Sequence, residues 1–332
     1  MNFIVVAPPK NEKSAGSMVL YELADELMEV GFNARRVLLT QDKSGKFYIS
    51  LDGQSYFPLF IDTFEKHFDP EHTIIIHGEN LHHKFFDNFN VARYYLNKIG
   101  ALRNIGVPRK GEFKISWEPC YVEAPDFLLR KNVIKKPINE QFRLDQPRSI
   151  DLTYVGKRHI DTPGLGRLPH TLELTRTWPE KTDEYIYLLS KTRFVFTFDV
   201  LSSVIEDAII YGAAPVILDC KPFKDYHSWG ETALKSVFDC CCDISEFEKI
   251  SDNNLDEYFK NFFDARLRLV NGLDKIEKEY QTNLKRLVKE MRDYFDLNHS
   301  PTSIEQKSTQ IGISKNPNYD KTNNMNSGVI NT

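Results

Sequence analysis

The chain has 332 residues, 41% of them hydrophobic and 12% aromatic, with a formal net charge of −4. This composition supports packed cores and excludes global disorder, and the length allows two domains of roughly 100–200 residues each. The near balance of 43 basic and 47 acidic residues argues against a nucleic-acid partner. No apolar run approaches the roughly 20 residues that span a bilayer and no secretory signal is visible, so we expect a cytoplasmic protein.

The first half of the chain alternates strand and helix patterns. Two predicted helices end at glycines, Gly31 and Gly100, which are common helix terminators. Strands separated by helix-sized segments predict βαβ units and a parallel sheet. The predicted elements are, in chain order, strand Phe3–Ala7, helix Met18–Val30, strand Ala34–Thr40, strand Thr73–Ile76 and helix Asn88–Ile99.

The second half repeats this alternation. Its most informative stretch runs from Arg193 to Leu218, where a continuous apolar strand, typical of a sheet covered on both faces, leads into a short helix that ends at Gly212. The predicted elements are strand Leu152–Val155, strand Thr171–Leu174, helix Asp183–Ser190, strand Phe194–Phe198, a helix opening at Ser202, strand Pro215–Leu218 and a largely helical segment Asn254–Phe295.

These patterns predict an α/β fold of two Rossmann-like domains that face a cleft, with helices at the C-terminal end. We expect the first domain at residues 1–135, a linker at 136–149, the second domain with its closing helices at 150–298, and a disordered polar tail at 299–332. Open α/β sheets bind ligands outside the carboxyl ends of their strands, so candidate site residues are sought there.

In the second half, cations and a helix start follow the predicted strands. Lys157 comes after a strand through Gly156, which permits a sharp turn, and its ammonium suits a diphosphate. Arg176 follows the next strand, and its guanidinium could donate two hydrogen bonds to the same diphosphate. Ser202 and Ser203 open a helix whose free N–H groups and dipole favour an anion. The ordinary alternatives are solvated loop cations and a simple N-cap.

Three acids accompany this helix start. Asp199 stands at the end of the apolar strand, Asp207 follows eight residues later, and Glu206 is its neighbour. Their carboxylates are candidates to accept hydrogen bonds from the hydroxyl groups of a ribose or a hexose. The alternative for Asp207 is a solvent-facing helix acid.

The first half offers a second set of candidates. Glu79 follows strand Thr73–Ile76, where a catalytic acid or base on the acceptor side would stand, and the alternative is a surface turn acid. Gly16 and Ser17 open the first helix and allow close approach of a phosphate or an acceptor sugar. Asn90 and Arg93 share one face of the predicted helix at i, i+3 spacing, although a helix-surface cation is the more ordinary reading of Arg93.

Several common sites lack their motifs. The sequence has no Gly-x-Gly-x-x-Gly, no P-loop and no Gly-x-Ser-x-Gly, which removes the usual support for dehydrogenases, ATPases and α/β-hydrolases. His82 and His83 have no partner motif, and the adjacent cysteines Cys240, Cys241 and Cys242 cannot converge on one ion. We therefore expect no metal site and no cofactor.

Three passages resemble bacterial glycosyltransferases of the GT-B fold. They are APPKNEKSAGSMVLYELADELMEVGFNARRV, then HGENLHHKFFDNFNVARYYLNKIG, and then TYVGKR through RTWPEKTDEYIYLLSKT to FTFDVLSSVIEDAIIYGAAPVIL, together covering roughly residues 1–220. The second passage is similar to a polysaccharide-associated subgroup. In the third, an acid-x7-acid pair precedes the turn Gly-Ala-Ala-Pro-Val. Asp199 and Asp207 stand there, whereas the better-known pattern has two glutamates.

The resemblance implies a glycosyltransferase that moves a sugar from a nucleotide-sugar donor to a glycan or lipid-linked glycan, in surface polysaccharide biosynthesis. It places Lys157 and the Ser202 helix start at the donor phosphates, Asp207 at the ribose or sugar hydroxyls, Asp199 near the donor sugar and Trp178 at the base. No metal is needed where cations and a helix dipole offset the charge of the departing diphosphate.

Two other functions stay open at this point: a non-catalytic nucleotide-sugar-binding partner subunit, and an epimerase or hydrolase on the same frame. Peripheral contact with the inner membrane face is a further expectation for the basic amphipathic segment Asn283–Phe295, against the alternative of a plain solvated face.

Overall fold

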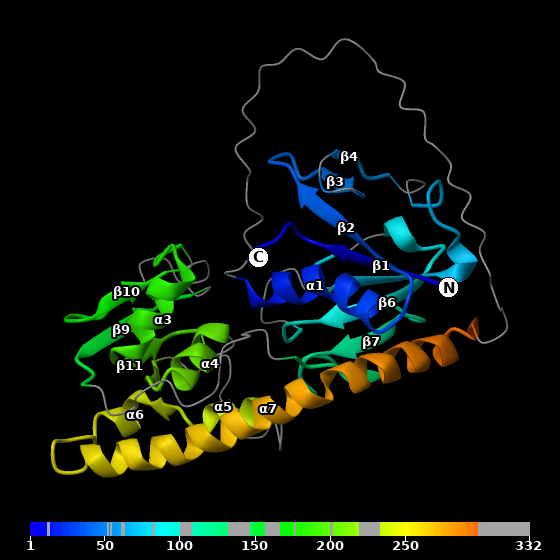
Figure 1. Cartoon of the computed structure of the whole chain (residues 1–332). Helices are drawn as coiled ribbons and strands as arrows, with labels where there is room; N and C mark the ends of the chain where they lie inside the picture. The colour runs from blue at the N-terminus through cyan, green and yellow to red at the C-terminus, as the bar shows by residue number, and fades with distance from the viewer. Residues whose placement is uncertain are drawn as a thin grey trace.

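The computed structural model of the chain shows a mixed α/β fold with two sheets of mainly parallel strands (Figure 1). It describes residues 1–11, 14–51, 53, 55–60, 64–81, 84–99, 108–131, 147–156, 167–175, 177–199, 202–218 and 233–297.

In the described part of the chain the first sheet has eight strands in the order β4-β3-β2-β1-β5-β6-β7-β8. Every neighbouring pair from β2 to β8 is parallel, and β3 and β4 add an antiparallel edge. The strands are β1 Asn2–Ala7, β2 Ala34–Gln41, β3 Phe47–Ser50, β4 Phe57–Pro58, β5 Thr73–Gly78, β6 Asn90–Tyr95, β7 Phe113–Ser116 and β8 Phe127–Leu128, and short 3-10 turns occur at Pro70–His72 and Lys84–Phe86.

Both faces of this sheet are covered, which explains why its central strands are apolar runs rather than alternating patterns. One face packs on helix α1 (Ala15–Glu29), whose Leu23 and Leu27 are fully buried with Ile74 and Ile76 of β5. The other face carries Ile75 in a separate buried cluster rich in phenylalanine. The central strands therefore lie inside the molecule, and only the strand ends lead to its surface.

The second sheet has the order β10-β9-β11-β12-β13 among the described residues, and all of its neighbouring pairs are parallel. Helix α3 packs on one face through Leu188 and Leu189, which share a buried cluster with Leu152 and Val195. The elements are β9 Ile150–Tyr154, β10 Leu172–Leu174, α3 Thr182–Ser190, β11 Thr192–Thr197, α4 Ser203–Ile210, β12 Ala214–Ile217, α5 Ala233–Phe238, β13 Cys242–Asp243 and α6 Ile244–Phe247.

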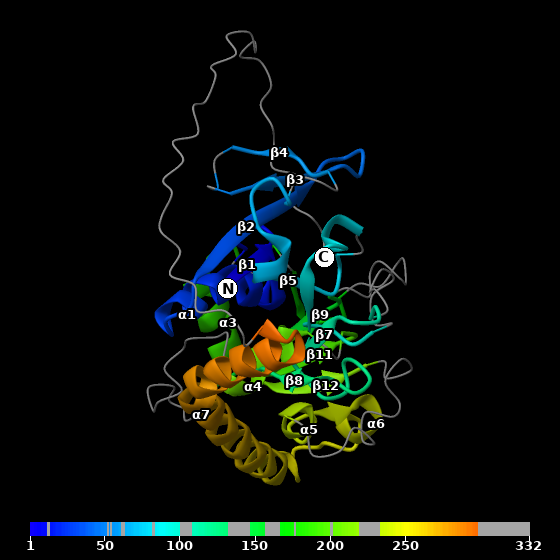
Figure 2. The same cartoon turned by 90° about the vertical axis from the view of Figure 1, so that its right-hand side faces the viewer.

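One long helix, α7 (Leu255–Tyr294), packs on both sheets. Its 40 residues extend about 60 Å at 1.5 Å per residue. Phe262 and Leu269 lie in the buried cluster of the second sheet, whereas Leu284 and Leu287 lie in that of the first. Figures 1 and 2 show the helix, coloured yellow to orange, running past one sheet and then the other. The two sheets are thus connected by shared packing on α7.

The predicted helix Asn88–Ile99 is wrong, because the structure forms strand β6 there. Its apolar residues Val91, Tyr94 and Tyr95 fit a helical period, but β-branched and aromatic residues also favour strands. Pairing decides between the two, since β6 lies between β5 and β7 in parallel register and the chain buries residues on both faces. The short strands β3, β4, β7 and β8 were not predicted either.

The other predicted strands and helices are confirmed to within a few residues at their ends. The predicted helical segment Asn254–Phe295 matches α7 closely, with Asn254 as the N-cap and Phe295 as the C-cap. The predicted linker 136–149 lies outside the described residues except for residues 147–149, and the predicted tail 299–332 lies wholly outside them. The division into two domains stays a prediction.

Candidate functional site

The carboxyl ends of β9 and β11 meet at one edge of the second sheet. Gly156, two residues after β9, has a backbone φ of +63°, and a Cβ atom built there would lie 2.4 Å from Asp199 Oδ2 and 2.8 Å from Tyr154 Cε1. No side chain fits in that space, and the left-handed conformation suits glycine. The sharp turn predicted at Gly156 is therefore present, and it presses against the carboxylate that follows β11.

Asp199 is held in this position by its surroundings. Its side chain is largely buried, and its backbone N–H donates to Thr197 Oγ1 at 3.0 Å. Lys157, which follows Gly156 directly, and Arg176 lie outside the described residues, so their roles remain predictions.

Helix α4 begins four residues after Asp199, and the serines at its start were predicted. Ser202 is the N-cap, and its side-chain oxygen accepts a hydrogen bond from the Val204 N–H at 3.3 Å. Ser203 is the first helical residue and is exposed. The positive end of the helix dipole favours an anion here, while the Val204 and Ile205 N–H groups already donate to Ser202.

Two arginines bind the opposite end of α4. Arg148 Nη2 donates to the Tyr211 carbonyl at 2.9 Å, and Arg266 of α7 donates to the carbonyls of Ile209 and Ile210 at 3.0 and 2.6 Å. Cations at a helix C-terminus satisfy its free carbonyls and interact favourably with its dipole. The position of α4 is thus set by residues from outside the helix.

The two acids within α4, Glu206 and Asp207, both accept hydrogen bonds from other side chains of the protein. Tyr185 of α3 donates its hydroxyl hydrogen to Asp207 Oδ2 at 2.7 Å, and Asp207 is 8% exposed. Burial, together with the Asp207 charge, raises the pKa of Tyr185 well above its usual range. Glu206 accepts from Arg130 Nη2 at 2.6 Å. The structure therefore brings Gly156, Asp199 and Ser202 together, while it places Glu206 and Asp207 in contacts within the protein.

A second group of candidates lies at the carboxyl edge of the first sheet. Glu79 follows β5, is 3% exposed, and accepts the Leu96 N–H at 3.0 Å through Oε2. A Cβ atom at Gly16 would lie 3.7 Å from Leu96, so the start of α1 reaches the same place. Ser17 donates its hydroxyl to Ser14, the N-cap of α1, at 2.9 Å. Gly16 and Glu79 thus flank one residue, Leu96.

Asn90 and Arg93 do not form the predicted helix face. They lie three residues apart on a strand, so their side chains project from opposite faces of the sheet. Asn90 begins β6, roughly 16 Å along the strand from its carboxyl end at about 3.3 Å per residue. Arg93 is 2% exposed and forms a bidentate ion pair with Glu112, at 2.9 Å from Nε and 2.6 Å from Nη2. The two residues therefore do not share a face, and Arg93 is not the surface cation of the alternative interpretation.

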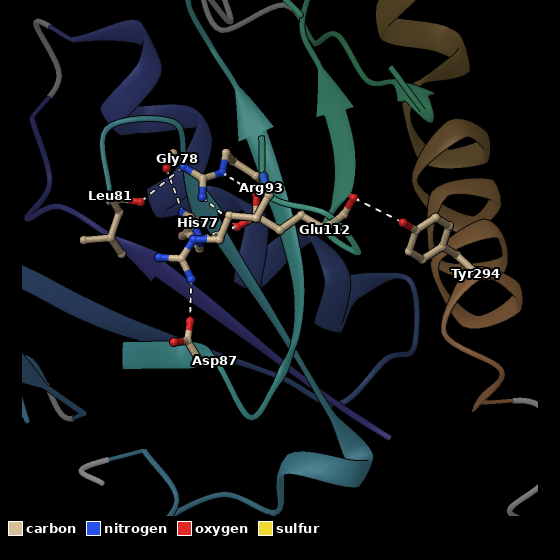
Figure 3. Close-up of polar contacts among 8 residues, drawn as sticks. His77, Gly78, Leu81, Asp87, Arg93, Glu112 and Tyr294 are labelled. Carbon is tan, nitrogen blue, oxygen red and sulfur yellow. Dashed lines mark hydrogen bonds and ion pairs between the residues drawn. The ribbon is translucent and has the colours of Figure 1, made fainter. Parts of the chain in front are cut away.

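The Arg93–Glu112 pair belongs to a buried polar network that the sequence did not reveal (Figure 3). Arg93 Nη1 donates to the Leu81 carbonyl at 3.3 Å, and His77 Nδ1 donates to the Gly78 carbonyl at 2.8 Å. Burial and the nearby Arg93 charge lower the pKa of His77 to about 4, so its imidazole is neutral near pH 7. These bonds fix both ends of the turn that carries Glu79.

The network extends to neighbouring elements. Arg109 donates its backbone N–H to Glu112 at 3.0 Å and pairs with Asp87, and Tyr294 of α7 donates to the Glu112 carbonyl at 3.3 Å. Only the i, i+3 spacing of Arg109 and Glu112 was visible in the sequence, and that spacing is common on any polar surface. Residues that meet across distant segments leave no local signal.

Within the described ranges, no group of three or more His, Cys, Asp or Glu side chains is arranged to hold a metal ion. His82 and His83 lie outside those ranges. Cys240 and Cys242 are buried, and Cys241 is partly buried. Among the described helices, none combines the length and apolar character of a membrane span.

Comparisons with known proteins gave matches in structure only. No protein-family model matches the chain, and no curated protein matches its sequence. A structure of T4 phage BGT in complex with UDP and Mn2+ aligns with a TM-score of 0.42 and 11% identity, over 88% of this chain and 99% of that one. A structure of T4 phage β-glucosyltransferase gives a TM-score of 0.41, 11% identity and the same coverage. TM-scores below 0.5 do not by themselves establish a common fold, and this chain's own residues carry the proposal that follows.

Proposed function

We propose that the protein is a glycosyltransferase, which moves a sugar from a nucleotide-sugar donor to a glycan or lipid-linked glycan acceptor, in surface polysaccharide biosynthesis. One observation carries the proposal. The Gly156 turn packs against Asp199 directly before the Ser202-capped start of α4, at the carboxyl edge of a parallel sheet. Such an edge is where α/β sheets bind nucleotides, and a helix start favours their phosphates.

The donor would be held by the second sheet. Its diphosphate would accept hydrogen bonds from the first turn of α4 and from Ser202 and Ser203, with Lys157 and Arg176 as the cations. Asp199 would lie beside the donor sugar, where its carboxylate can accept a hydrogen bond from a sugar hydroxyl. Asp207 already accepts from Tyr185, so it would contribute through its remaining lone pairs or by holding α4 against α3.

The acceptor would lie at the first sheet, with Gly16 and Ser17 close to it. Glu79 is the candidate general base: it would take the proton of the acceptor hydroxyl as that oxygen forms its bond to the anomeric carbon. The bond from the anomeric carbon to the donor phosphate breaks, and the nucleoside diphosphate leaves with the electron pair. Cations and the α4 dipole would stabilise this leaving group, so the proposed mechanism does not need a resident metal.

Two measurements test this function. Calorimetry with UDP, GDP, CMP and dTDP should show one clear binder, and a nucleotide-sugar panel with mass analysis of the products should show transfer to a glycan. Lys157→Ala should weaken binding of the bare nucleotide, and Asp199→Ala should reduce transfer more than nucleotide binding. Wild-type affinity and activity in both variants would show that the donor site has been assigned to the wrong residues.

A non-catalytic nucleotide-sugar-binding subunit is the second candidate. The observation that favours it is the engagement of two α4 acids, Glu206 by Arg130 and Asp207 by Tyr185, in contacts within the protein. Binding of a nucleotide sugar without turnover, with or without acceptor, would support this reading. Turnover of the nucleotide sugar in the absence of any acceptor would instead indicate an epimerase or a hydrolase.

A further inference from the structure

A buried ion cluster connects the first sheet to α4. Arg130, two residues after β8, lies with Nη1 2.8 Å from Glu118 Oε1 and with Nη2 2.6 Å from Glu206 Oε2. Glu118 follows β7 of the first sheet, whereas Glu206 belongs to the first turn of α4. The side chains of Arg130 and Glu118 are 9% and 2% exposed. One guanidinium from the first sheet thus holds a carboxylate of the proposed donor helix.

The surroundings of this cluster are packed and apolar. Tyr121 and Val122, in the same loop as Glu118, share a buried cluster with Ile205 and Ile209 of α4. Burial alone would lower the pKa of Arg130, but Glu206 and Glu118 outweigh it and raise that pKa above its ordinary value. Arg130 therefore stays charged at every physiological pH, and solvent reaches its pair with Glu206 only from the Glu206 side, where the side chain is 20% exposed.

The charge of Glu206 matters for any anion at the start of α4. Glu206 is three residues after Ser203, about 5 Å along the helix axis at 1.5 Å per residue. The Cα–Cβ bonds of a helix tilt toward its N-terminus, which brings the Glu206 carboxylate closer to that end. An unpaired carboxylate there would interact with the positive end of the dipole and would repel a diphosphate. Pairing with Arg130 offsets this repulsion.

We propose that Arg130 is a positioning residue of the donor site: by pairing with Glu206, it removes a carboxylate charge that would oppose the donor diphosphate, and it ties the first turn of α4 to the first sheet. This inference rests on the proposed function, because it needs a diphosphate at the start of α4. Arg148 and Arg266 hold the other end of the helix. The helix is then fixed at both ends by arginines from outside it.

The test is calorimetric titration of the full chain with free UDP, GDP and dTDP. Arg130→Met should weaken binding of the preferred nucleoside diphosphate about tenfold, since it leaves the Glu206 charge unpaired. Glu206→Gln alone should bind more tightly than the wild type, because it removes a negative charge and leaves Arg130 in place. The double variant Arg130→Met/Glu206→Gln should return toward wild-type affinity, a recovery that a purely structural role of Arg130 would not produce.

A matched control is Arg193→Met, which removes an arginine paired with Asp151 at 2.6 Å at the opposite edge of the same sheet and should leave affinity unchanged. If the wild type binds none of the nucleotides, the proposed function itself falls and this inference falls with it. If the wild type binds but the double variant is as weak as Arg130→Met, the inference alone is overturned. Weaker binding by Glu206→Gln would also overturn it, would indicate direct contact of Glu206 with the donor, and can be measured even if Arg130→Met fails to fold.

Discussion

The buried Arg93–Glu112 pair gives the sharpest stability prediction. Both side chains are almost completely removed from solvent, at 2% and 7% exposure, and they share two hydrogen bonds. Burial alone would raise the pKa of Glu112, but the hydrogen bonds from Arg93 and from the Arg109 N–H outweigh it and lower that pKa. Arg93→Met would leave the buried Glu112 charge with only the Arg109 N–H at 3.0 Å and the more distant Arg109 Nε at 3.9 Å, or would force Glu112 to take up a proton.

Removal of one partner from a buried pair costs about 3–5 kcal/mol of the free energy of unfolding. With a urea m-value of about 3 kcal/mol/M, the unfolding midpoint should fall by more than about 1 M. The double variant Arg93→Met/Glu112→Leu should recover most of this loss, because no charge is then left buried. Urea unfolding followed by circular dichroism at pH 7 measures all three proteins.

Arg286→Met is the matched control for this series. Arg286 pairs with Glu290 on the surface of α7 at 3.6 Å, with the two side chains 60% and 43% exposed, so its removal should cost less than about 1 kcal/mol. A midpoint for Arg93→Met that equals the control's would refute the reasoning, because it would show that Glu112 does not depend on Arg93 for its charge. A double variant less stable than Arg93→Met would refute it as well.

Three further predictions follow from single contacts. The pKa of His77 is lowered from 6.5 to about 4, so the neutral imidazole contributes roughly 3 kcal/mol to the free energy of unfolding above pH 6.5. This contribution is lost as the pH falls toward 4, and the free energy of unfolding of His77→Gln, measured against pH, should lack that decrease. Gly156→Ala should displace Asp199 and strain the backbone, which lowers both the melting temperature and sugar transfer, and an unchanged melting temperature would contradict the contact. Tyr185→Phe removes one hydrogen bond to the buried Asp207 and should lower the unfolding free energy by about 1–3 kcal/mol in calorimetry, whereas exposed Tyr187→Phe should not.

Much of the fold was predictable because its signals are local. Apolar runs such as Phe194–Phe198 and the helical period of Asn254–Phe295 each indicate one element without knowledge of any partner. The serine at the start of α4 likewise marked its N-cap before the structure was known. The helix prediction for Asn88–Ile99 was wrong for the opposite reason. These residues suit both a strand and a helix, and only pairing with β5 and β7 decides between the two.

The residues of the candidate site also divide into those that were predictable from the sequence and those that were not. The turn at Gly156 and the acid at Asp199 were predictable, because each follows directly from the end of a strand and parallel strands bring their carboxyl ends to one edge. The partners of Arg93, Asp207 and Glu206 were not. Glu206 and Arg130, for example, are 76 positions apart, and nothing in the sequence around either residue indicates that the other is its partner.

Local patterning thus determined where strands and helices form and which polar residues stand at their ends, because backbone geometry and side-chain periodicity act over a few residues. The ion pairs that bury Arg93 and Arg130, and the packing of α7 on both sheets, were decided by the tertiary structure. A buried charge must find its counter-charge wherever the folded chain places one, and that choice is made across segments far apart in sequence.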